Sequence, residues 1–552
     1  HPRRTGRPAP RWAGRLAALG LAAAGLVGAT LPAAAPASAG LLGTQPYIVS
    51  DSNGVGSALA ASVVTSVGGQ VLQPLDISNA VLANLTSLEV TLLQAVPGVT
   101  VTPDVTVYVQ SSGSSSHPGS DAFLQESQAT NTWTTGDTGA GVNVAVLDTG
   151  IDPLPDFAGR LVGGVDLSGG GNPFNDQYGH GTFVAGLVAG NGASSNGKYM
   201  GEAPGAGLVA VKVAGSTGTT DLATIIAGVG WTVANEAALH IGVLNMSLGY
   251  QPIASTAVDP LDFAVEQAWR AGIVVVTSAG NAGPFNGTIV SPGDDPLVIT
   301  TGALDDMGTP STADDQMAPF SSVGPTSPDG WFKPDLVASG RSVISLRAAG
   351  STVDTTYPSA RVGTGNFVGS GTSFSAAIMS GAAALLLAAH PGYLPNDVKS
   401  ALLQSTTPGP VGNPFVDGHG ALDVAAAVSA TPVALSQPVA GVPVAMGTTV
   451  LLQNTWAESA WNPGNWQSVA WNSVAWNGSS WSGVSGNSVA WNGSVWNSVA
   501  WNGNAWNSVA WNGAGWNSVA WNGSSWNSVA WNGSSWNGAA WNSVAWNGSS
   551  WN

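Results

Sequence analysis

The sequence predicts an α/β protein whose core is a mostly parallel sheet with helices on both faces. Between about residues 129 and 430, short runs rich in Val, Ile and Leu alternate with longer helical patterns such as DLATIIAGVGWTVANEA. The strand-like runs are VNVAVLDTG, GLVAVKVAG, GVLNMSLG and GIVVVTSAGN. Continuous apolar strands separated by helices are typical of a parallel sheet that is buried on both faces. Each run ends in small or polar residues, so we expect a ligand site beyond the carboxyl ends of the strands.

Length and composition limit the function classes. A chain of 552 residues is too long for one ordinary core, so two or more domains are expected. Its formal net charge is −17, and a chain this acidic is not expected to bind nucleic acid. It contains no cysteine, so packing rather than disulfide bonds must hold the fold together.

Residues 1–39 have the pattern of a secretory signal peptide. A leader with five arginines precedes an apolar run that begins at Leu16, and Ala37-Ser38-Ala39 has the small-x-small form of a cleavage site. Removal of these five arginines would change the formal charge from −17 to −22. The alternative is a retained membrane anchor, which Gly and Pro residues within a short apolar run disfavour. We find no other apolar run of membrane length, so we expect a secreted, extracellular protein without a transmembrane segment.

Residues 40–128 have the pattern of a small α+β unit. PYIVS and VTVYVQ are β-rich, and VGSALAASVVTSVGG alternates helically up to a glycine stop. The stretch SSGSSSHPGS, at 111–120, then has the composition of a flexible link that is open to cleavage. This unit is either an independent module or a removable pro-segment.

The C-terminal part changes character after a Pro-containing linker at 431–455. In residues 456–552 a Trp occurs at every fifth position from 456 to 551, with Gly486 as the exception. A period of five residues gives no continuous helical face, and Asn, Gly and Ser favour helices poorly. The repeats form either a β-rich stack of the solenoid type or a disordered low-complexity tail.

A candidate nucleophile lies in the stretch GSGTSFSAAIMSG at 369–381. Ser373 is either a simple helix cap or a nucleophile, and a nucleophilic serine needs a base that a carboxylate holds in orientation. Of the six histidines, His180 in GHGTFVAGLVAG is the best candidate base, because the flanking glycines allow a close backbone approach. Asp148 ends the strand VNVAVLD, where burial would require a partner for its charge. Asp152 and Asp156, in the loop that follows, are expected to be solvated.

These stretches resemble the subtilisin-like serine proteases, the subtilase family. The motifs AVLDTGID, GHGTFVAG and GTSFSAAIMSG occur in the family's order, with SAGNAG and KPDLVASG among the landmarks between them, over roughly 300 residues. The resemblance implies that Ser373 attacks the peptide carbonyl, that His180 transfers the proton, and that Asp148 orients the imidazole. It also implies that Asn281, in SAGNAG, donates a hydrogen bond to the oxyanion.

The resemblance further implies polypeptide substrates. The segments that would line the substrate, and to which an extended peptide would add as a strand, are formed by Ser247, Leu248 and Gly249 and by Ser278, Ala279 and Gly280. Their small residues predict a roomy, uncharged pocket between them. Catalysis would require no cofactor. Structural calcium is common in the family, but we identify no loop with a dense set of metal ligands.

The same resemblance implies that 40–128 is a pro-segment that assists folding and inhibits its own enzyme. We expect the chain to cut itself between Val109 and Trp133, which leaves residues 129–430 as the catalytic domain. The chain departs from the family at Phe183, at Ala377-Ile378 and at Ala338-Ser339-Gly340, where we expect effects on packing rather than on activity.

The sequence therefore predicts a secreted serine endopeptidase that is made as a self-processing precursor. The Trp repeats would attach it to the cell envelope or to an insoluble substrate. The alternative is a catalytically disused scaffold that acts as a cell-surface binding or adhesive protein through these repeats.

Overall fold

The computed structural model describes residues 43–52, 56–109 and 118–438, together with short strands between 449 and 546. The predicted signal peptide, most of the predicted link at 111–120, and most of the predicted linker and repeats lie outside the described residues.

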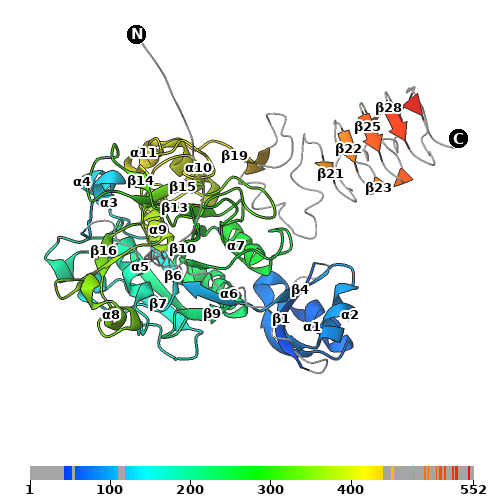
Figure 1. Ribbon diagram of the computed structural model, residues 1–552, viewed down its shortest axis with the longest axis horizontal. Helices are drawn as coiled ribbons and strands as arrows, with labels where there is room; N and C mark the ends of the chain where they lie inside the picture. Colours follow the sequence, from blue (N-terminus) through cyan, green and yellow to red (C-terminus); the bar gives the residue numbers. More distant parts are fainter. Residues whose placement is uncertain are drawn as a thin grey trace, which may run out of the picture. The chain divides into compact units, whose positions relative to one another are not determined.

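The catalytic-domain region contains an eight-stranded mixed sheet, in agreement with the predicted α/β class (Figure 1). Its main order is β14-β13-β12-β10-β6-β8-β7, and β15 also pairs with β13. Every pair is parallel except β13 with β14. The strands are β6 (Asn143–Asp148), β7 (Leu161–Asp166), β8 (Gly207–Lys212), β10 (Ile241–Met246), β12 (Val274–Ser278), β13 (Ile299–Asp305), β14 (Gln316–Met317) and β15 (Leu336–Ser339).

Helices cover this sheet because its strands are apolar on both faces. The helix α9 (Thr372–Ala389) packs on β10, β12 and β13 and against α5 (His180–Ala189). The helices α6 (Leu222–Leu239) and α7 (Pro260–Arg270) pack against each other. Of these two, α6 contacts β10 and α7 contacts β12. Among the described helices, α9 is long and apolar enough to cross a membrane, but it is the buried core helix of this domain. The remaining helices are α3 (Phe123–Glu126), α4 (Ala129–Thr134), α8 (Thr352–Thr356), α10 (Pro395–Gln404) and α11 (Val424–Ser429).

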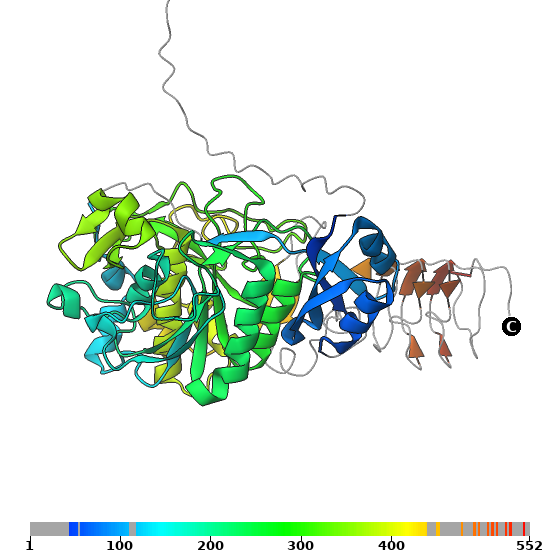
Figure 2. The same cartoon turned by 90° about the horizontal axis from the view of Figure 1, so that it is seen from below.

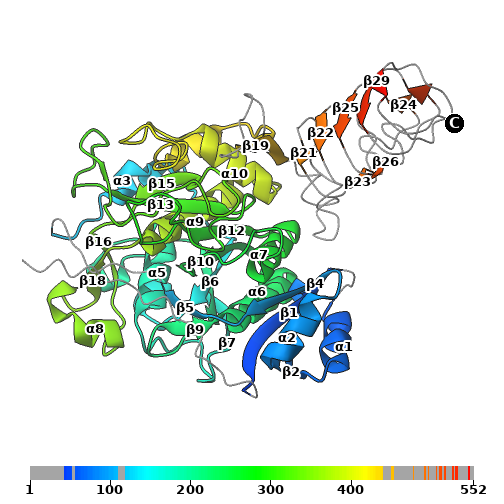
Figure 3. The ribbon, with the colours of Figure 1, turned by 45° about the vertical axis from the view of Figure 1, so that its right-hand side comes forward.

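Short strands complete the catalytic-domain region. Two of these short strands, β9 (Thr219–Asp221) and β11 (Leu248–Gly249), belong to a three-stranded sheet with the order β11-β5-β9. A separate antiparallel sheet, β16-β18-β17, contains β16 (Val343–Leu346), β17 (Arg361–Val362) and β18 (Asn366–Gly369). Figure 3 labels β5 and β9 of the first sheet and β16 and β18 of the second.

The first part of the described chain is a small α+β unit, as its sequence pattern indicates. An antiparallel sheet with the order β2-β3-β1-β4 packs against two helices, and α2 begins with a capping box between Thr86 and Glu89 (Figure 2). Its last strand, β5, leaves this sheet and joins β9 and β11 instead. The elements are β1 (Gln45–Asp51), α1 (Ala58–Ser66), β2 (Gln70–Leu75), β3 (Ala80–Leu85), α2 (Ser87–Gln94), β4 (Val99–Pro103) and β5 (Thr106–Val109).

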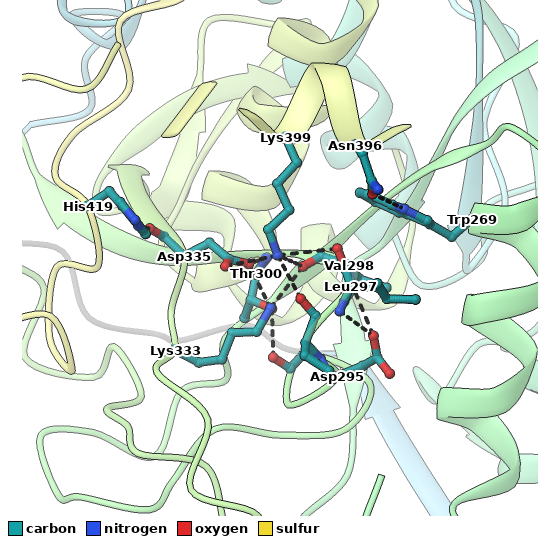
Figure 4. Close-up of polar contacts among 12 residues, drawn as sticks. Trp269, Asp295, Leu297, Val298, Thr300, Lys333, Asp335, Asn396, Lys399 and His419 are labelled. Atoms are coloured by element: carbon teal, nitrogen blue, oxygen red, sulfur yellow. Dashed lines mark hydrogen bonds and ion pairs between the residues drawn. The ribbon is translucent and has the colours of Figure 1, made fainter. Parts of the chain in front are cut away.

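A buried cluster of ammonium groups fixes the chain just before and at the start of β13 (Figure 4). Lys333 and Lys399 both donate to the carbonyl oxygen of Val298, at 2.8 and 2.9 Å. Asp335 lies between them, 2.7 Å from the Lys333 Nζ and 3.0 Å from the Lys399 Nζ. Lys399 also donates to the carbonyl oxygens of Pro296 and Leu297. All three charged side chains are fully buried, so each charge depends on these partners.

The described strands within residues 476–546 pair in parallel, whereas the two strands between 435 and 452 pair antiparallel with each other. β22 (Ala490–Asn492), β25 (Val509–Asn512) and β28 (Val529–Asn532) align so that residues twenty apart in the chain are partners, as in Trp491, Trp511 and Trp531. The other strands are β19 (Leu435–Pro438), β20 (Thr449–Leu452), β21 (Trp476–Asn477), β23 (Val495–Trp496), β24 (Ala505–Trp506), β26 (Gly515–Trp516), β27 (Ser525–Trp526) and β29 (Ala545–Trp546). The predicted repeat stack as a whole remains a prediction.

Candidate active site

Asp148 and His180 meet at the carboxyl edge of the central sheet. Asp148 is the last residue of β6, and His180 is the first residue of α5. The His180 Nδ1 lies 2.8 Å from Asp148 Oδ1 and 2.9 Å from Oδ2. Both side chains are buried, and the backbone N–H of Thr149 also donates to Asp148 at 2.8 Å. The carboxylate therefore holds the Nδ1 edge of the imidazole ring and leaves Nε2 on the other edge without a contact to Asp148.

Glycines on both sides of His180 allow this approach. Gly179 has a φ of 104°, in the left-handed region that favours glycine. A Cβ atom on Gly181 would lie only 2.2 Å from the carbonyl oxygen of Gly150. The helix can thus begin directly against the end of β6, which is the close backbone approach that the GHG motif predicts.

A second buried carboxylate, which the sequence reasoning missed, shapes the turn before α5. Asp176 accepts hydrogen bonds from the N–H groups of Gly179 and Thr182, at 2.7 and 2.8 Å, and from the hydroxyl of Thr149 at 2.7 Å. The same Thr149 hydroxyl accepts from the N–H of Gly181. Burial raises the pKa of Asp176, and these hydrogen bonds oppose the rise. The available signal was an acidic residue just before a predicted helix start.

The expectation for Asp156 was wrong, because this residue is fully buried. Its carboxylate accepts from the N–H of Ser194 at 3.0 Å and from the Ser194 hydroxyl. The partner is distant in sequence, so the loop position of Asp156 gave no sign of it. Asp152 is half-buried and accepts from the N–H of Asp176 at 2.8 Å.

Ser373 lies in the first turn of α9, at the same edge of the sheet. Its hydroxyl donates to the carbonyl oxygen of Ser247 at 3.0 Å, and the Ser247 hydroxyl donates back to the carbonyl of Ser373 at 2.9 Å. The His180 Nε2 is buried and forms no hydrogen bond with any residue that the structure describes. The imidazole ring also packs near Phe374, the residue after Ser373, with ring centroids 5.6 Å apart. A hydrogen bond between these two groups would require the Ser373 hydroxyl to turn toward Nε2.

The side chain of Asn281 is held next to the start of α9. Its Oδ1 accepts from the backbone N–H of Thr372 at 2.9 Å and from the Thr372 hydroxyl at 3.0 Å. Its Nδ2 is buried and has no hydrogen-bond partner among the described residues. Because Oδ1 is anchored, the amide N–H groups have a fixed direction and are available to an acceptor.

The predicted substrate segment at 247–249 is paired with a strand of the same chain. β11, which consists of Leu248 and Gly249, pairs antiparallel with β5, so that Leu248 is opposite Val109 and Gly249 is opposite Tyr108. The other edge of β5 pairs with β9 (Figure 3). An extended segment thus occupies the place at which the sequence predicts strand addition by a substrate.

The space between the two predicted substrate segments is narrower than their small residues indicated. Ser278, Ala279 and Gly280 continue from β12, and Ser278 and Ala279 are fully buried. A Cβ atom on Gly249 would lie 2.6 Å from Val290 Cγ2, and one on Gly280 would lie 2.9 Å from Val290 Cγ1. The Val290 side chain therefore fills part of the space in which the sequence predicts a roomy pocket.

The departures from the family pattern are accommodated by packing. Phe183 packs against Phe374 in a tilted arrangement with ring centroids 4.3 Å apart, and Ala377 and Ile378 are fully buried in the core. The hydroxyl of Ser339 donates to Glu126 at 2.7 Å. Among the described residues, no group of three or more His, Asp or Glu side chains is arranged to hold a metal ion.

Comparison with known proteins places these motifs in a family. A model of the subtilase family matches residues 139–420. Serine protease AprX of Bacillus subtilis (strain 168) is 46% identical over 291 residues, which cover 52% of this chain and 66% of that protein. Subtilisin NAT of Bacillus subtilis subsp. natto is 33% identical over 375 residues, which cover 67% of this chain and 86% of that protein. A thermostable alkaline protease of Halalkalibacterium halodurans is 33% identical over 366 residues, with coverages of 65% and 86%.

Proposed function

Because this chain belongs to the subtilase family and is a subtilisin-like serine protease, we propose that it is a secreted endopeptidase with Asp148, His180 and Ser373 as its catalytic triad. The observation that carries this proposal is the buried contact between His180 Nδ1 and Asp148 at the edge of the sheet where α9 presents Ser373.

Acylation would begin when the Ser373 hydroxyl attacks the carbonyl carbon of the scissile bond. His180 Nε2 takes the hydroxyl proton, and Asp148 stabilises the imidazolium that results. When the tetrahedral intermediate collapses, His180 gives this proton to the leaving amine, and the C–N bond breaks. The acyl group remains as an ester on Ser373.

Deacylation repeats these steps with water. His180 takes a proton from a water molecule as the water oxygen attacks the ester carbonyl, and it returns this proton to the Ser373 oxygen as the ester bond breaks. The products are a carboxylate and an amine, and the enzyme is regenerated. No step needs a cofactor, so we propose that calcium, if bound, serves stability alone.

The negative charge on the carbonyl oxygen would be stabilised by the Asn281 Nδ2 and the backbone N–H of Ser373. Asn281 is suited to this role because its Oδ1 accepts two hydrogen bonds from Thr372. These bonds fix the plane of the side-chain amide and therefore the direction of the Nδ2 N–H groups. The first turn of α9 adds the positive end of a helix dipole. These donors are in place before the charge develops, which is the condition for a large effect on the rate.

We propose that the unit before the catalytic domain is an inhibitory pro-segment. Its last strand, β5, adds to β11 as a substrate would. Three further hydrogen bonds join it to the catalytic domain. Asp104 accepts from the N–H of Ala223 at 2.9 Å, and the carbonyl oxygen of Val105 accepts from the N–H of Leu222 at 3.1 Å. The Ser78 hydroxyl donates to the carbonyl oxygen of Pro260 at 2.7 Å. These contacts favour an inhibitor over an independent module.

The register of β5 supports a cleavage site. Val109, the last described residue of β5, is opposite Leu248, and the neighbouring Ser247 has its carbonyl oxygen 3.0 Å from the Ser373 hydroxyl. We therefore propose that the chain cuts itself after Gln110, within the predicted interval from Val109 to Trp133. Residues 118–128 would then remain with the catalytic domain, where Phe123 and Leu124 are buried in its core.

Substitution of the nucleophile tests the function and the processing together. Ser373→Ala should abolish casein hydrolysis and labelling by a serine-directed phosphonate, and it should leave the purified precursor uncut. Ser375→Ala, on the same helix, is the matched control and should retain all three activities. Casein hydrolysis by Ser373→Ala at the control's rate would remove Ser373 from the mechanism.

The alternative of a disused scaffold predicts no casein hydrolysis by the wild-type protein. It also gives no reason for an aligned Asp148–His180 pair or for the oriented amide of Asn281. A casein assay on the wild-type protein decides between the two functions.

For the Trp repeats we propose attachment to the cell envelope or to insoluble protein. Support comes from the sequence between 459 and 552, which is rich in Trp and contains no charged residue. Trp side chains that are exposed in such a number would usually have a binding partner. A chain that ends at Thr455 should cleave soluble peptides normally and lose its retention on cell walls. Equal retention with and without the repeats would refute attachment.

A further inference from the structure

A group of five acidic side chains is buried between α7 and the loop that carries Val290, and none of them has a role in the steps above. Each is at most 1% exposed. We infer that these side chains, here called the acid cluster, form a proton-dependent contact that holds residues 290–295 against α7 and keeps the predicted substrate pocket narrow. For substrates, this inference rests on the proposed endopeptidase function. The acid cluster consists of Asp259, at the start of α7, of Asp262 and Glu266, within α7, and of Asp294 and Asp295, in the loop.

Hydrogen bonds connect the acid cluster to the predicted pocket, which would take the residue before the scissile bond. The Ser291 hydroxyl donates to Asp262 at 3.2 Å, and the Tyr250 hydroxyl donates to Asp259. Tyr250 and Ser291 also exchange two backbone hydrogen bonds, at 2.9 and 3.2 Å. Tyr250 follows Gly249 and Ser291 follows Val290, and these two neighbours face each other where the pocket is narrow. The acid cluster therefore holds both sides of that narrow part.

The acid cluster has fewer hydrogen-bond donors than its oxygens would need if all were charged. Asp259 accepts from the N–H of Leu261 at 2.8 Å, and Asp295 accepts from the N–H of Leu297 at 2.8 Å. A buried carboxylate oxygen without a donor carries an uncompensated cost of desolvation. Five buried oxygens accept from no donor among the described residues, namely Asp262 Oδ2, Asp294 Oδ1, Asp295 Oδ2 and both Oε atoms of Glu266.

Protons can supply the missing donors. The carboxyl groups of Glu266 and Asp295 are in hydrogen-bonding contact across the boundary between α7 and the loop. A hydrogen bond between two carboxyl groups requires that one of them carries a proton, because a carboxylate can only accept. Like charges at this separation cannot all be present together in a buried site. The contact between helix and loop is therefore favourable only while the acid cluster holds protons.

Few positive charges face the acid cluster. An arginine on α7 attracts Glu266, and two lysines attract Asp295, but both lysines are already paired with Asp335 (Figure 4). A further carboxylate adds negative charge near Asp294. The surroundings therefore do not neutralise five ionised carboxyl groups. These facing charges are Arg270, Lys333, Lys399 and Asp329.

The direction of the pKa changes fixes the direction of the pH effect. Burial raises the pKa of Asp262 well above its usual range, and Asp294 adds to the rise. Burial also raises the pKa of Glu266, Asp295 adds to this rise, and Arg270 opposes it. A carboxyl group whose pKa is raised by folding stabilises the fold fully below its ordinary pKa, and this contribution is lost as the pH rises through the raised pKa.

The consequence for the pocket follows from where the charges appear. As the pH rises, charges develop on α7 and on residues 294–295 and repel each other across the contact. The loop should then be held less tightly, and Val290 should leave more room between Gly249 and Gly280. Large side chains before the scissile bond should gain most from this room.

The first test measures kcat/KM for cleavage after Phe and after Ala with matched p-nitroanilides, between about pH 6 and about pH 9. In the wild-type enzyme the ratio of Phe to Ala should rise at least about fivefold with pH, as expected for the widening of an apolar pocket. The ratio is taken within one enzyme at one pH, so the titration of His180 and the folded fraction cancel. In Asp262→Asn/Glu266→Gln, which keeps the shapes and loses the charges, the ratio should stay within about twofold.

Glu236→Gln is the matched control, because it makes the same change on α6, outside the acid cluster, and it should retain the wild-type rise. Glu266→Gln alone is the milder second variant and should show a smaller rise than the wild type. A constant ratio in the wild-type enzyme, or an undiminished rise in the double variant, would overturn the inference.

The second test does not depend on activity and uses the full-length Ser373→Ala protein. Its Tm should fall between the same two pH values, and Asp262→Asn/Glu266→Gln in this background should remove most of the fall, whereas Glu236→Gln should not. An equal fall in the double variant would show that the acid cluster is not the titrating site. Absence of p-nitroanilide cleavage at every pH would instead refute the proposed function, and the Tm would still report on the acid cluster.

Discussion

The two sides of the candidate active site are built in different ways. On the proposed acyl side, β11 and β9 offer backbone edges, and β5 of the same chain occupies them by strand pairing. On the other side, a cavity beside His180 is built from side chains on α8, β18 and the residues between them. Backbone pairing accepts most sequences, whereas side-chain contacts depend on the sequence of the bound segment. The comparison teaches that the fold presents a backbone surface and a side-chain surface next to the same histidine.

The largest expected effect should be independent of both sides, because it acts on the scissile bond between them. Asn281→Ala should lower kcat by about 10²–10³-fold with little change in KM, since the oxyanion exists only in the transition state. This magnitude is the one measured for the loss of such a donor in subtilisin. The kcat should fall by the same factor for peptides with Gly and Phe after the scissile bond. A rise in KM alone would show that Asn281 binds substrate instead.

A smaller effect should be confined to the acyl side. Val290→Gly removes the side chain between Gly249 and Gly280 and should deepen the pocket there. Cleavage after Phe should then improve about tenfold or more relative to cleavage after Ala, as measured by kcat/KM with matched p-nitroanilides. Ile289→Val, at the buried neighbouring residue, is the control and should retain the wild-type preference. If Val290→Gly also changed the preference after the scissile bond, the two sides would not be independent.

The smallest effect concerns the pH dependence of β5 docking. Burial raises the pKa of Asp104 to about 6, Asp221 adds to the rise, and the N–H of Ala223 opposes it. A carboxyl group whose pKa is raised in the docked state stabilises docking fully below its ordinary pKa, and this contribution is lost as the pH rises through about 6. In the full-length Ser373→Ala precursor, hydrogen-exchange protection of β5 should therefore be several-fold lower at pH 7.5 than at pH 4.5, after correction for intrinsic exchange.

Asp104→Asn provides the comparison for this measurement. It removes the titrating group and keeps a side-chain oxygen that can accept from Ala223, so protection of β5 should no longer change across this interval. A pH dependence equal to that of the parent precursor would assign the effect to another group.

The parts of the molecule that could be predicted from the sequence are those that local patterns specify. Strand runs such as VNVAVLD place Asp148 at the sheet edge, and the glycines around His180 indicate a close backbone approach that the structure contains. Asn281 follows the strand β12 and contacts Thr372, the residue before Ser373 at the start of α9. The α/β class follows from the same alternation of strands and helices.

The parts that could not be predicted depend on contacts between distant segments. Val290 narrows the pocket from a loop between two strands, and nothing in its own neighbourhood of the sequence marks it as a neighbour of Gly249. Asp156 is buried because Ser194 satisfies it. The cavity beside His180 needs α8, a helix of five residues without a strong pattern. Each of these features follows from tertiary packing, which cannot be predicted from local patterns of residue types.

The buried lysine cluster has a consequence for how the fold responds to its surroundings. Carbonyl oxygens from Pro296 to Val298 and a carboxylate from Asp335 are ligands that a hard metal ion also prefers, but here Lys333 and Lys399 supply the positive charge. A bound metal ion dissociates from its ligands when the concentration of the free ion in the medium falls. An ammonium group on a side chain has no such exchange with the medium. At the lysine cluster, dilution or chelation of divalent ions therefore should not destabilise the fold.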